Sequence, residues 1–264
     1  MMKRIYTIGY VALMLITFAF LYTGCKRLSA YDYSPYVYFN LVEEAYLNSD
    51  ENSPYCDFSM DYSCLNEEND TIAALINEVI HREFLGAEFA SLAPAEAVDS
   101  FKNTYLRNYR TETGELYEAD KAKMTEGAEV PAWYGQTYSI VTFMEEGRDG
   151  IMGASANYFV DLGGAHPSQW SKWLNFDTNT GQLLTVNDVF ELQELENIED
   201  LLHDAVLKQK VDLYPDTKAF LTENFMLAKE GVRFLYNRYD IAPRSSGSIM
   251  VEIPYEVIEP YLKK

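Results

Sequence analysis

Residues 133–162 read WYGQTYSIVTFM-EEGRDG-IMGASANYFVDL, and this segment is the clearest indicator of the architecture. Apolar and aromatic residues alternate with polar ones in both outer parts, whereas residues 145–150 are charged or glycine. A period of two on both sides of a polar turn is typical of an antiparallel β-hairpin. We therefore expect Trp133–Met144 and Ile151–Leu162 to form such a hairpin.

Two strand patterns precede the hairpin in the N-terminal part of the chain. Residues 36–47 and 55–62 are β-like and are separated by Ser, Asn, Asp and Pro54. Tyrosines recur at positions 31, 33, 36 and 38, a stripe that favours an edge strand packed on its own domain over a sugar-stacking surface.

Two helices are expected next. From Asn69 to Phe84 apolar residues recur at i, i+3, i+4 and i+7, and Asp70 suits the N-cap. A second helix is expected to begin at Pro94 and end near Arg110, because proline is favoured in a first helical turn. Residues 111–130 are polar and charged and indicate a loop or the seam between subdomains.

Downstream of the hairpin, short strand patterns alternate with two helical ones. No repeat of about 20–50 residues is visible, which excludes solenoids and propellers. We predict an α+β fold, a mainly antiparallel sheet with packed helices in two intimately associated subdomains. The expected strands are 170–176, 225–227, 232–236 and 248–253, and the expected helices are 195–210 and 255–262.

Composition indicates a folded acidic protein. The chain has 264 residues, of which 48% are apolar and 14% aromatic, and its formal net charge is −20. Such a charge repels phosphate backbones, so nucleic acid is excluded as a partner class. Neutral or cationic partners fit the charge.

The first 24 residues resemble an export signal. Lys3 and Arg4 precede a run without charge that ends in Leu21-Tyr22-Thr23-Gly24-Cys25. Small residues before a cysteine are typical of a lipoprotein signal, so we expect cleavage after residue 24 and a lipid on Cys25. An uncleaved membrane anchor and simple secretion are the alternatives. In each case the remaining chain is exported, and loss of the two cations leaves a net charge of −22.

The other two cysteines, Cys56 and Cys64, have seven residues between them. In an oxidising compartment this spacing allows a disulfide across a hairpin or a compact loop. The alternative is two unpaired thiols in neighbouring strands. Without a nearby histidine the pair is a poor zinc site.

Known catalytic and metal-binding signatures are absent from the sequence. There is no nucleophile elbow, no phosphate-binding glycine loop and no zinc-protease motif, so no catalytic residue, metal or cofactor is predicted. Asp177, Asn179 and Gly181 begin like a calcium loop, but Gln182 stands where the glycine is required. A hairpin turn explains these residues better.

Gly163-Gly164-Ala165-His166-Pro167 is the segment with unusual local chemistry. The glycines allow a sharp turn, and Pro167 favours an extended His166. We consider Gly163, Gly164, His166 and Pro167 candidate binding residues. The alternative is a tight corner whose histidine bonds to the neighbouring backbone.

This segment and the residues that follow it resemble a bacterial envelope domain of unknown function. The matching residues that follow are Asn175-Phe176-Asp177, Thr180-Gly181, Leu184-Thr185, Asp188 and Phe190. The domain is shared with lysozyme-sensing anti-sigma factors of the RsiV type and peptidoglycan deacetylases of the PdaC type. The C-terminal part of the chain is similar to the end of that domain at Gly231-Val232, Tyr239, Ile241-Ala242-Pro243, Gly247 and Ile253-Pro254-Tyr255. The helix expected from Asn69 to Phe84 resembles the start of the companion domain that usually precedes it.

We expect a signal peptide (1–24) and a tether (25–35) from the local sequence. The resemblance implies an N-terminal companion domain (36–160) and a C-terminal domain (161–264). In the deacetylases another domain is the catalyst, and in the anti-sigma factors the exported part binds lysozyme. We therefore expect a non-catalytic lipoprotein, anchored on the periplasmic or outer-membrane face of the envelope. Its expected ligand is a basic lysozyme-like protein or a cell-wall glycan. The alternatives are a carbohydrate-active enzyme that uses His166 with nearby carboxylates, and a purely structural lipoprotein.

Overall fold

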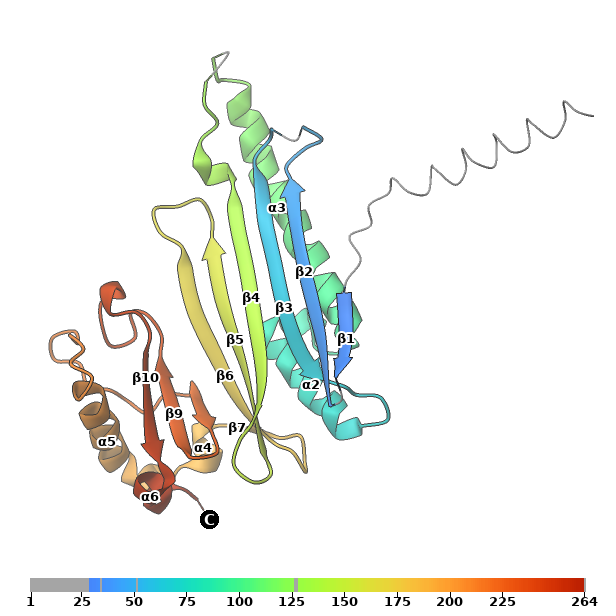
Figure 1. Ribbon diagram of the computed structural model, residues 1–264. Coiled ribbons are helices and arrows are strands. Elements are labelled where there is room, and N and C mark those ends of the chain that lie inside the picture. Colours follow the sequence, from blue (N-terminus) through green and yellow to red (C-terminus); the bar gives the residue numbers. More distant parts are fainter. Residues whose placement is uncertain (1–28, 34, 51, 126–127, 264) are drawn as a thin grey trace, which may run out of the picture.

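The computed structural model describes residues 29–33, 35–50, 52–125 and 128–263 (Figure 1). The expected signal peptide and Cys25 lie outside these residues. Within the described ranges, no helix is both long and apolar enough to cross a bilayer.

A seven-stranded sheet forms the larger layer, and its strands follow one another in chain order. The expected hairpin is confirmed: β4 and β5 pair antiparallel, with Val141 opposite Asn157. Only the β3–β4 pair within the sheet is parallel, because α2 and α3 form the crossover between these strands. The strands are β1 Ser29–Tyr33, β2 Tyr36–Tyr46, β3 Tyr55–Leu65, β4 Gln136–Glu146, β5 Ile151–Asp161, β6 Ser168–Asp177 and β7 Leu183–Leu184.

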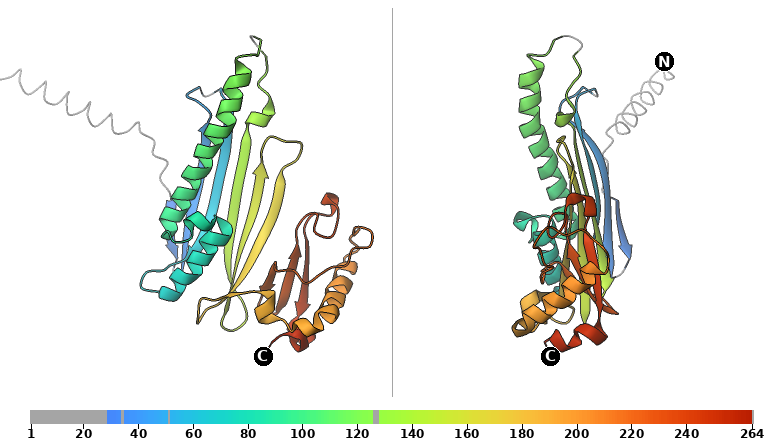
Figure 2. Two further views of the ribbon diagram at one scale, coloured as in Figure 1. Left: turned by 180° about the vertical axis from the view of Figure 1, so that it is seen from behind. Right: turned by 90° about the vertical axis from the view of Figure 1, so that its left-hand side faces the viewer.

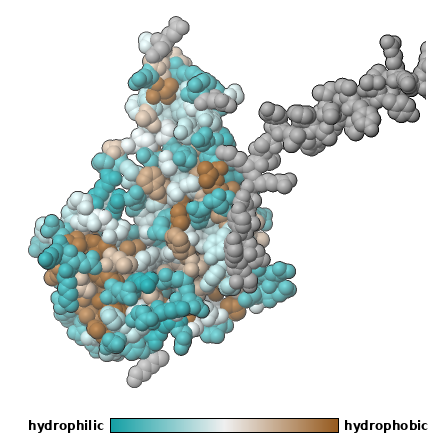
Figure 3. All heavy atoms as spheres, viewed as in Figure 1, coloured by the Kyte–Doolittle hydropathy of each residue, from teal (hydrophilic) through white to brown (hydrophobic). Residues whose placement is uncertain are grey.

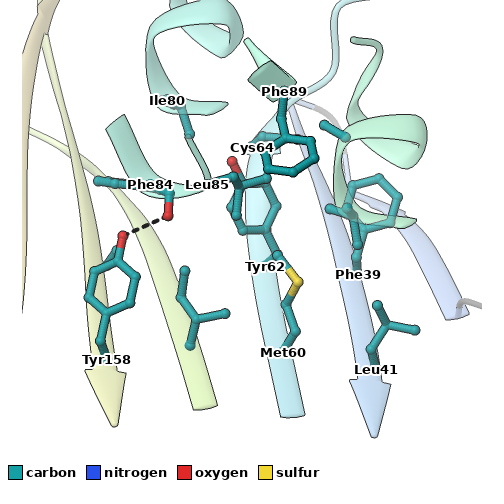
Figure 4. Packing of buried hydrophobic residues seen from close by; sticks show 14 of the residues in the cluster. Phe39, Leu41, Met60, Tyr62, Cys64, Ile80, Phe84, Leu85, Phe89 and Tyr158 are labelled. Carbon is teal, nitrogen blue, oxygen red and sulfur yellow. Dashed lines mark hydrogen bonds between the residues drawn. The ribbon is translucent and has the colours of Figure 1, made fainter. Parts of the chain in front are cut away.

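Helices α2 (Thr71–Phe84) and α3 (Pro94–Lys121) cover one face of this sheet (Figure 2). The Asp70 carboxylate caps α2 by accepting the N–H groups of Ile72 and Ala73, each at 3.0 Å. Tyr62 and Met60 of β3 point into the core below the helices, and the Tyr158 hydroxyl donates to the Phe84 carbonyl at 2.9 Å (Figure 4).

The loop expected over residues 111–130 is wrong for its first part, since α3 continues to Lys121. Two contacts on its inner side stabilise this part of the helix. The Tyr134 hydroxyl donates to the Asp120 carboxylate at 2.7 Å, and the rings of Tyr117 and Tyr134 lie 5.4 Å apart. Tertiary packing thus extends a helix whose local sequence is polar.

The C-terminal part of the chain has its own core. Its three strands pair antiparallel in the order β10-β9-β8, and α5 packs on β10. Phe190, Phe225 and Phe234 lie at the centre of this second core. The fold is therefore α+β, as predicted. The elements are α4 Val186–Val189, α5 Leu195–Leu207, β8 Phe225–Leu227, β9 Gly231–Tyr236, β10 Ile249–Pro254 and α6 Tyr255–Ile258.

The two sheets meet along β6, and side-chain amides form the junction. Buried Asn175 of β6 donates to the Phe225 carbonyl at 2.9 Å and accepts the Leu227 N–H at 2.7 Å. From the other side, the amides of Asn224 and Asn237 bond the backbone of Ser171. The domain boundary expected at 160/161 falls between β5 and β6, inside the larger sheet.

The predicted disulfide between Cys56 and Cys64 is wrong. Both residues belong to β3, rather than to two strands, and both are free and buried. At ~3.3 Å per residue along a strand they are about 26 Å apart, far beyond the reach of a disulfide. Burial raises the pKa of each thiol to about 12.

Candidate functional site

The candidate binding segment forms the loop between β5 and β6. The Asp161 carboxylate accepts the N–H of Gly163 at 2.9 Å, which turns the chain directly after the strand. Gly163 has φ +73°, and a Cβ on it would lie 2.3 Å from the Cα of Trp133. Gly164 has open space around it. The first glycine is therefore required by the close approach of two loops.

The same loop borders a cavity of about 560 Å³, which we call the end pocket. Gly163 and Gly164 line it, whereas His166 and Pro167 do not. The other walls come from residues 52–57 and 130–137, which the β3–β4 and β4–β5 pairing brings to the same end of the sheet. Its volume lies in the range typical of small-ligand sites.

Carboxylates, amides and hydroxyls provide the polar groups of the end pocket. Asp57 and Asp161 flank Thr137 in register, and Asn52 and Gln136 add amides. Among the described lining residues there is no Lys, Arg or His. The lining can accept hydrogen bonds from hydroxyl and N–H groups, and it disfavours an anion.

One polar atom in this wall has no partner. Ser53 is 3% exposed, and its hydroxyl makes no hydrogen bond within the described part of the chain. Buried polar groups are normally hydrogen-bonded, so this hydroxyl is an unpaired group inside the wall of the pocket.

Exposed aromatic side chains stand at the border of the pocket. Tyr55 lines the pocket and is 41% exposed, and Trp133, which follows the lining residue Ala132 but is not itself part of the lining, is 57% exposed. A flat apolar ring next to carboxylates that accept hydrogen bonds from hydroxyl groups suits a ligand with apolar faces and polar edges, such as a sugar.

None of these neighbours was found from the sequence. Asp57, Trp133 and Asp161 belong to segments far apart in the chain, and they meet because of strand register. The tryptophan at position 133, close to the start of a predicted strand, was the one feature of the sequence that could have pointed to this region.

His166, the candidate acid or base, is exposed. It makes no hydrogen bond or ion pair with any other described residue. His81 belongs to α2 and is buried. His203 is half-buried, and its Nδ1 accepts the Ala219 N–H at 3.3 Å. In the residues searched, no group of His, Cys, Asp and Glu could hold a metal ion.

The remaining motif residues have structural roles. The Asp177 carboxylate accepts the N–H groups of Asn179 and Thr180, and Gly181 completes the turn with φ +76°. This confirms the hairpin turn in place of a calcium loop. Thr185 and Asp188 form a capping box at the start of α4.

The segment that begins at this capping box carries the match to a known family. Residues 185–256 match DUF3298, a protein family of unknown function. The matched segment includes β8, β9 and β10 with α5, the whole of the second sheet, and it begins after the loop with Gly163.

Solved structures of DUF3298 proteins resemble the chain over most of its length. A member of the DUF3298 family from Bacteroides fragilis NCTC 9343 is 26% identical, with a TM-score of 0.77, and the similarity covers 90% of this chain and 95% of that chain. A DUF3298 family protein from Pseudomonas aeruginosa PAO1 is 17% identical, with a TM-score of 0.59 and the same coverage. The second likeness is one of fold alone.

One curated relative has a name that states an activity. A protein of Mycobacterium tuberculosis named as an esterase is 26% identical over 110 residues, which are 39% of this chain and 48% of that protein. The chain thus spans about half the length of this relative.

Proposed function

We propose that this protein is a non-catalytic, exported envelope lipoprotein that binds a cell-wall glycan in the end pocket. The observation that carries the proposal is the lining of that pocket: the carboxylates of Asp57 and Asp161 lie with the exposed Tyr55 ring, and the described lining residues include no cation. Carbohydrates present hydroxyl groups and apolar ring faces, and this lining is complementary to both.

Binding is tested by calorimetric titration with soluble oligomers of N-acetylglucosamine. Asp57→Ala removes an exposed hydrogen-bond acceptor and Trp133→Ala removes an exposed ring, so each variant should weaken binding by about tenfold. Asp204→Ala, at an exposed carboxylate on α5, is the matched control and should bind as the wild type does. Unchanged affinity in both pocket variants would contradict the choice of site.

The lipoprotein part of the proposal is supported by the leader sequence that ends at Cys25. Mass spectrometry of the native N-terminus should find a lipidated Cys25. An intact Met1 would contradict cleavage and favour an anchor.

The lysozyme-like partner and the enzymatic alternative are tested in the same preparation. Titration with lysozyme at low and at high salt tests the basic-protein ligand, because attraction to a chain of net charge −20 depends on salt. Hydrolysis of glycan fragments or of a simple acetyl ester that disappears in His166→Ala would replace the non-catalytic proposal.

A further inference from the structure

The face of the large sheet opposite α2 and α3 carries a second cavity, of about 330 Å³, beside the C-terminal part of the chain. We call it the cleft pocket. Its lining from the sheet includes Ser139, Asn157, Phe159, Gln169 and Ser171. Arg238, from the segment after β9, also lines it. In Figure 3, which shows this face, apolar side chains are interspersed with polar ones over the middle strands.

The two pockets adjoin along β4 and β5. Thr137 and Asp161 line the end pocket, and Ser139 and Phe159, two residues further on the same strands, line the cleft pocket. Residues i and i+2 of a strand point to the same face, at a spacing of ~6.6–7 Å. Ser139 has the small Ser59 on one side and Phe159 on the other. We call the two adjoining pockets together the furrow.

Arg238 gives this furrow a feature that the end pocket lacks. It is half-buried and forms no salt bridge within the described ranges, although the chain contains 41 acidic residues. In contrast, Arg148 and Arg233 each pair with a glutamate. A half-buried guanidinium without a carboxylate partner, aimed at a cavity, suits a carboxylate of a ligand.

We propose that the furrow binds an extended glycan bearing carboxylate groups, which lies along β4 and β5 from the end pocket to the cleft pocket. A carboxylate of the glycan pairs with Arg238, and its uncharged sugar units occupy the end pocket, where Asp57 and Asp161 disfavour an anion. This inference rests on the proposed function and adds to it the length and the charge of the ligand.

The test compares two tetrasaccharides of equal length by calorimetric titration. One contains only N-acetylglucosamine, and the other alternates N-acetylglucosamine with N-acetylmuramic acid, whose lactyl group supplies the carboxylate. A uronic-acid tetrasaccharide distinguishes a requirement for muramic acid from one for any carboxylate. The wild type should bind the carboxylate-bearing glycans about tenfold more tightly.

Arg238→Gln should abolish this preference while affinity for the N-acetylglucosamine tetramer stays the same. Arg107→Gln, an exposed arginine on α3 behind the sheet, changes the net charge equally and should keep the preference. Thermal unfolding of each variant checks that the fold is intact.

Ser139→Phe tests whether the pockets are continuous. A ring between them should lower affinity for the tetrasaccharide to that for a disaccharide, and disaccharide affinity should stay the same. Equal affinity for both tetrasaccharides in the wild type, or a preference that survives Arg238→Gln, overturns this inference and leaves the proposed function intact. Absence of binding by every glycan, with or without binding of lysozyme, overturns both.

Discussion

Gly163 and Gly164 are adjacent in the loop after β5, and their surroundings assign them different roles. Gly163 has a positive φ and touches the Trp133 backbone, so Gly163→Ala combines backbone strain with a steric clash. We expect this variant to lower the free energy of unfolding by about 1–3 kcal/mol. Gly164→Ala, with open space around it, should stay within about 0.5 kcal/mol of the wild type. Urea denaturation measures both, and equal effects would contradict the assignment.

His81 is the residue through which moderate acid should destabilise the protein. Its side chain is fully buried, with its ring 6.0 Å from that of Tyr62. Burial lowers the pKa of His81 to about 4, against a smaller opposite effect of the Leu92 backbone. Because the unfolded chain takes up this proton near pH 6.5, stability is complete above that pH and is lost as the pH falls towards 4.

The expected loss is at most about 3 kcal/mol at pH 4. Many carboxylates titrate in the same range, so the measurement is a difference between variants. The wild type should lose up to this amount more than His81→Leu when denaturation is compared at pH 7 and pH 4.5. His166→Leu, at an exposed histidine, is the control. Parallel pH profiles for the wild type and His81→Leu would show that His81 does not contribute.

Among the structural elements, the contact between β6 and β8 depends on one side chain. Asn175→Ala removes two hydrogen bonds and leaves the Phe225 carbonyl and the Leu227 N–H unpaired inside the junction. We expect a loss of about 2–4 kcal/mol in urea denaturation. Asn157→Ala, at an exposed amide on β5 bonded to Ser171, should cost less than about 1 kcal/mol. Similar losses would contradict a special role of Asn175.

At this scale the sequence predicts most of the fold. The Asp70 cap and the two-residue period of β4 and β5 depend on neighbours in the chain, and these predictions are confirmed. Features that depend on contacts between residues far apart in the chain leave no comparable pattern in the sequence. The end of α3 depends on Tyr134, and the place of Cys64 depends on how far β3 continues.

The candidate site shows the same limit. The glycines at 163 and 164 stand out in the sequence, yet Asp57 joins them only through the parallel register of β3 and β4. Arg238 was missed because an arginine without a partner can be recognised only when the surrounding carboxylates are placed. His166 stood out through its proline neighbour, but it lies outside the pocket lining.

For the whole molecule, net charge predicts an effect of salt on stability. A charge of −20 repels itself in the compact state, and salt screens this repulsion over a Debye length of ~10 Å at 0.1 M. Raising NaCl from low to moderate concentration should therefore raise the Tm by ~2 °C or more. Calorimetry at constant pH measures this, and a fall in Tm would mean that the surface ion pairs dominate.

The asparagines of the junction also affect how copies of the protein meet one another. β7 pairs with only two residues of β6, which leaves most of that strand at the outer edge of the large sheet. Such an edge invites another chain to add a strand, which is a common route to aggregation. Asn224 bonds the Trp173 N–H and the Ser171 carbonyl, and Asn237 bonds Ser171 as well. These backbone groups of β6 are therefore not open to an incoming strand, so the junction protects the protein from sheet-to-sheet association.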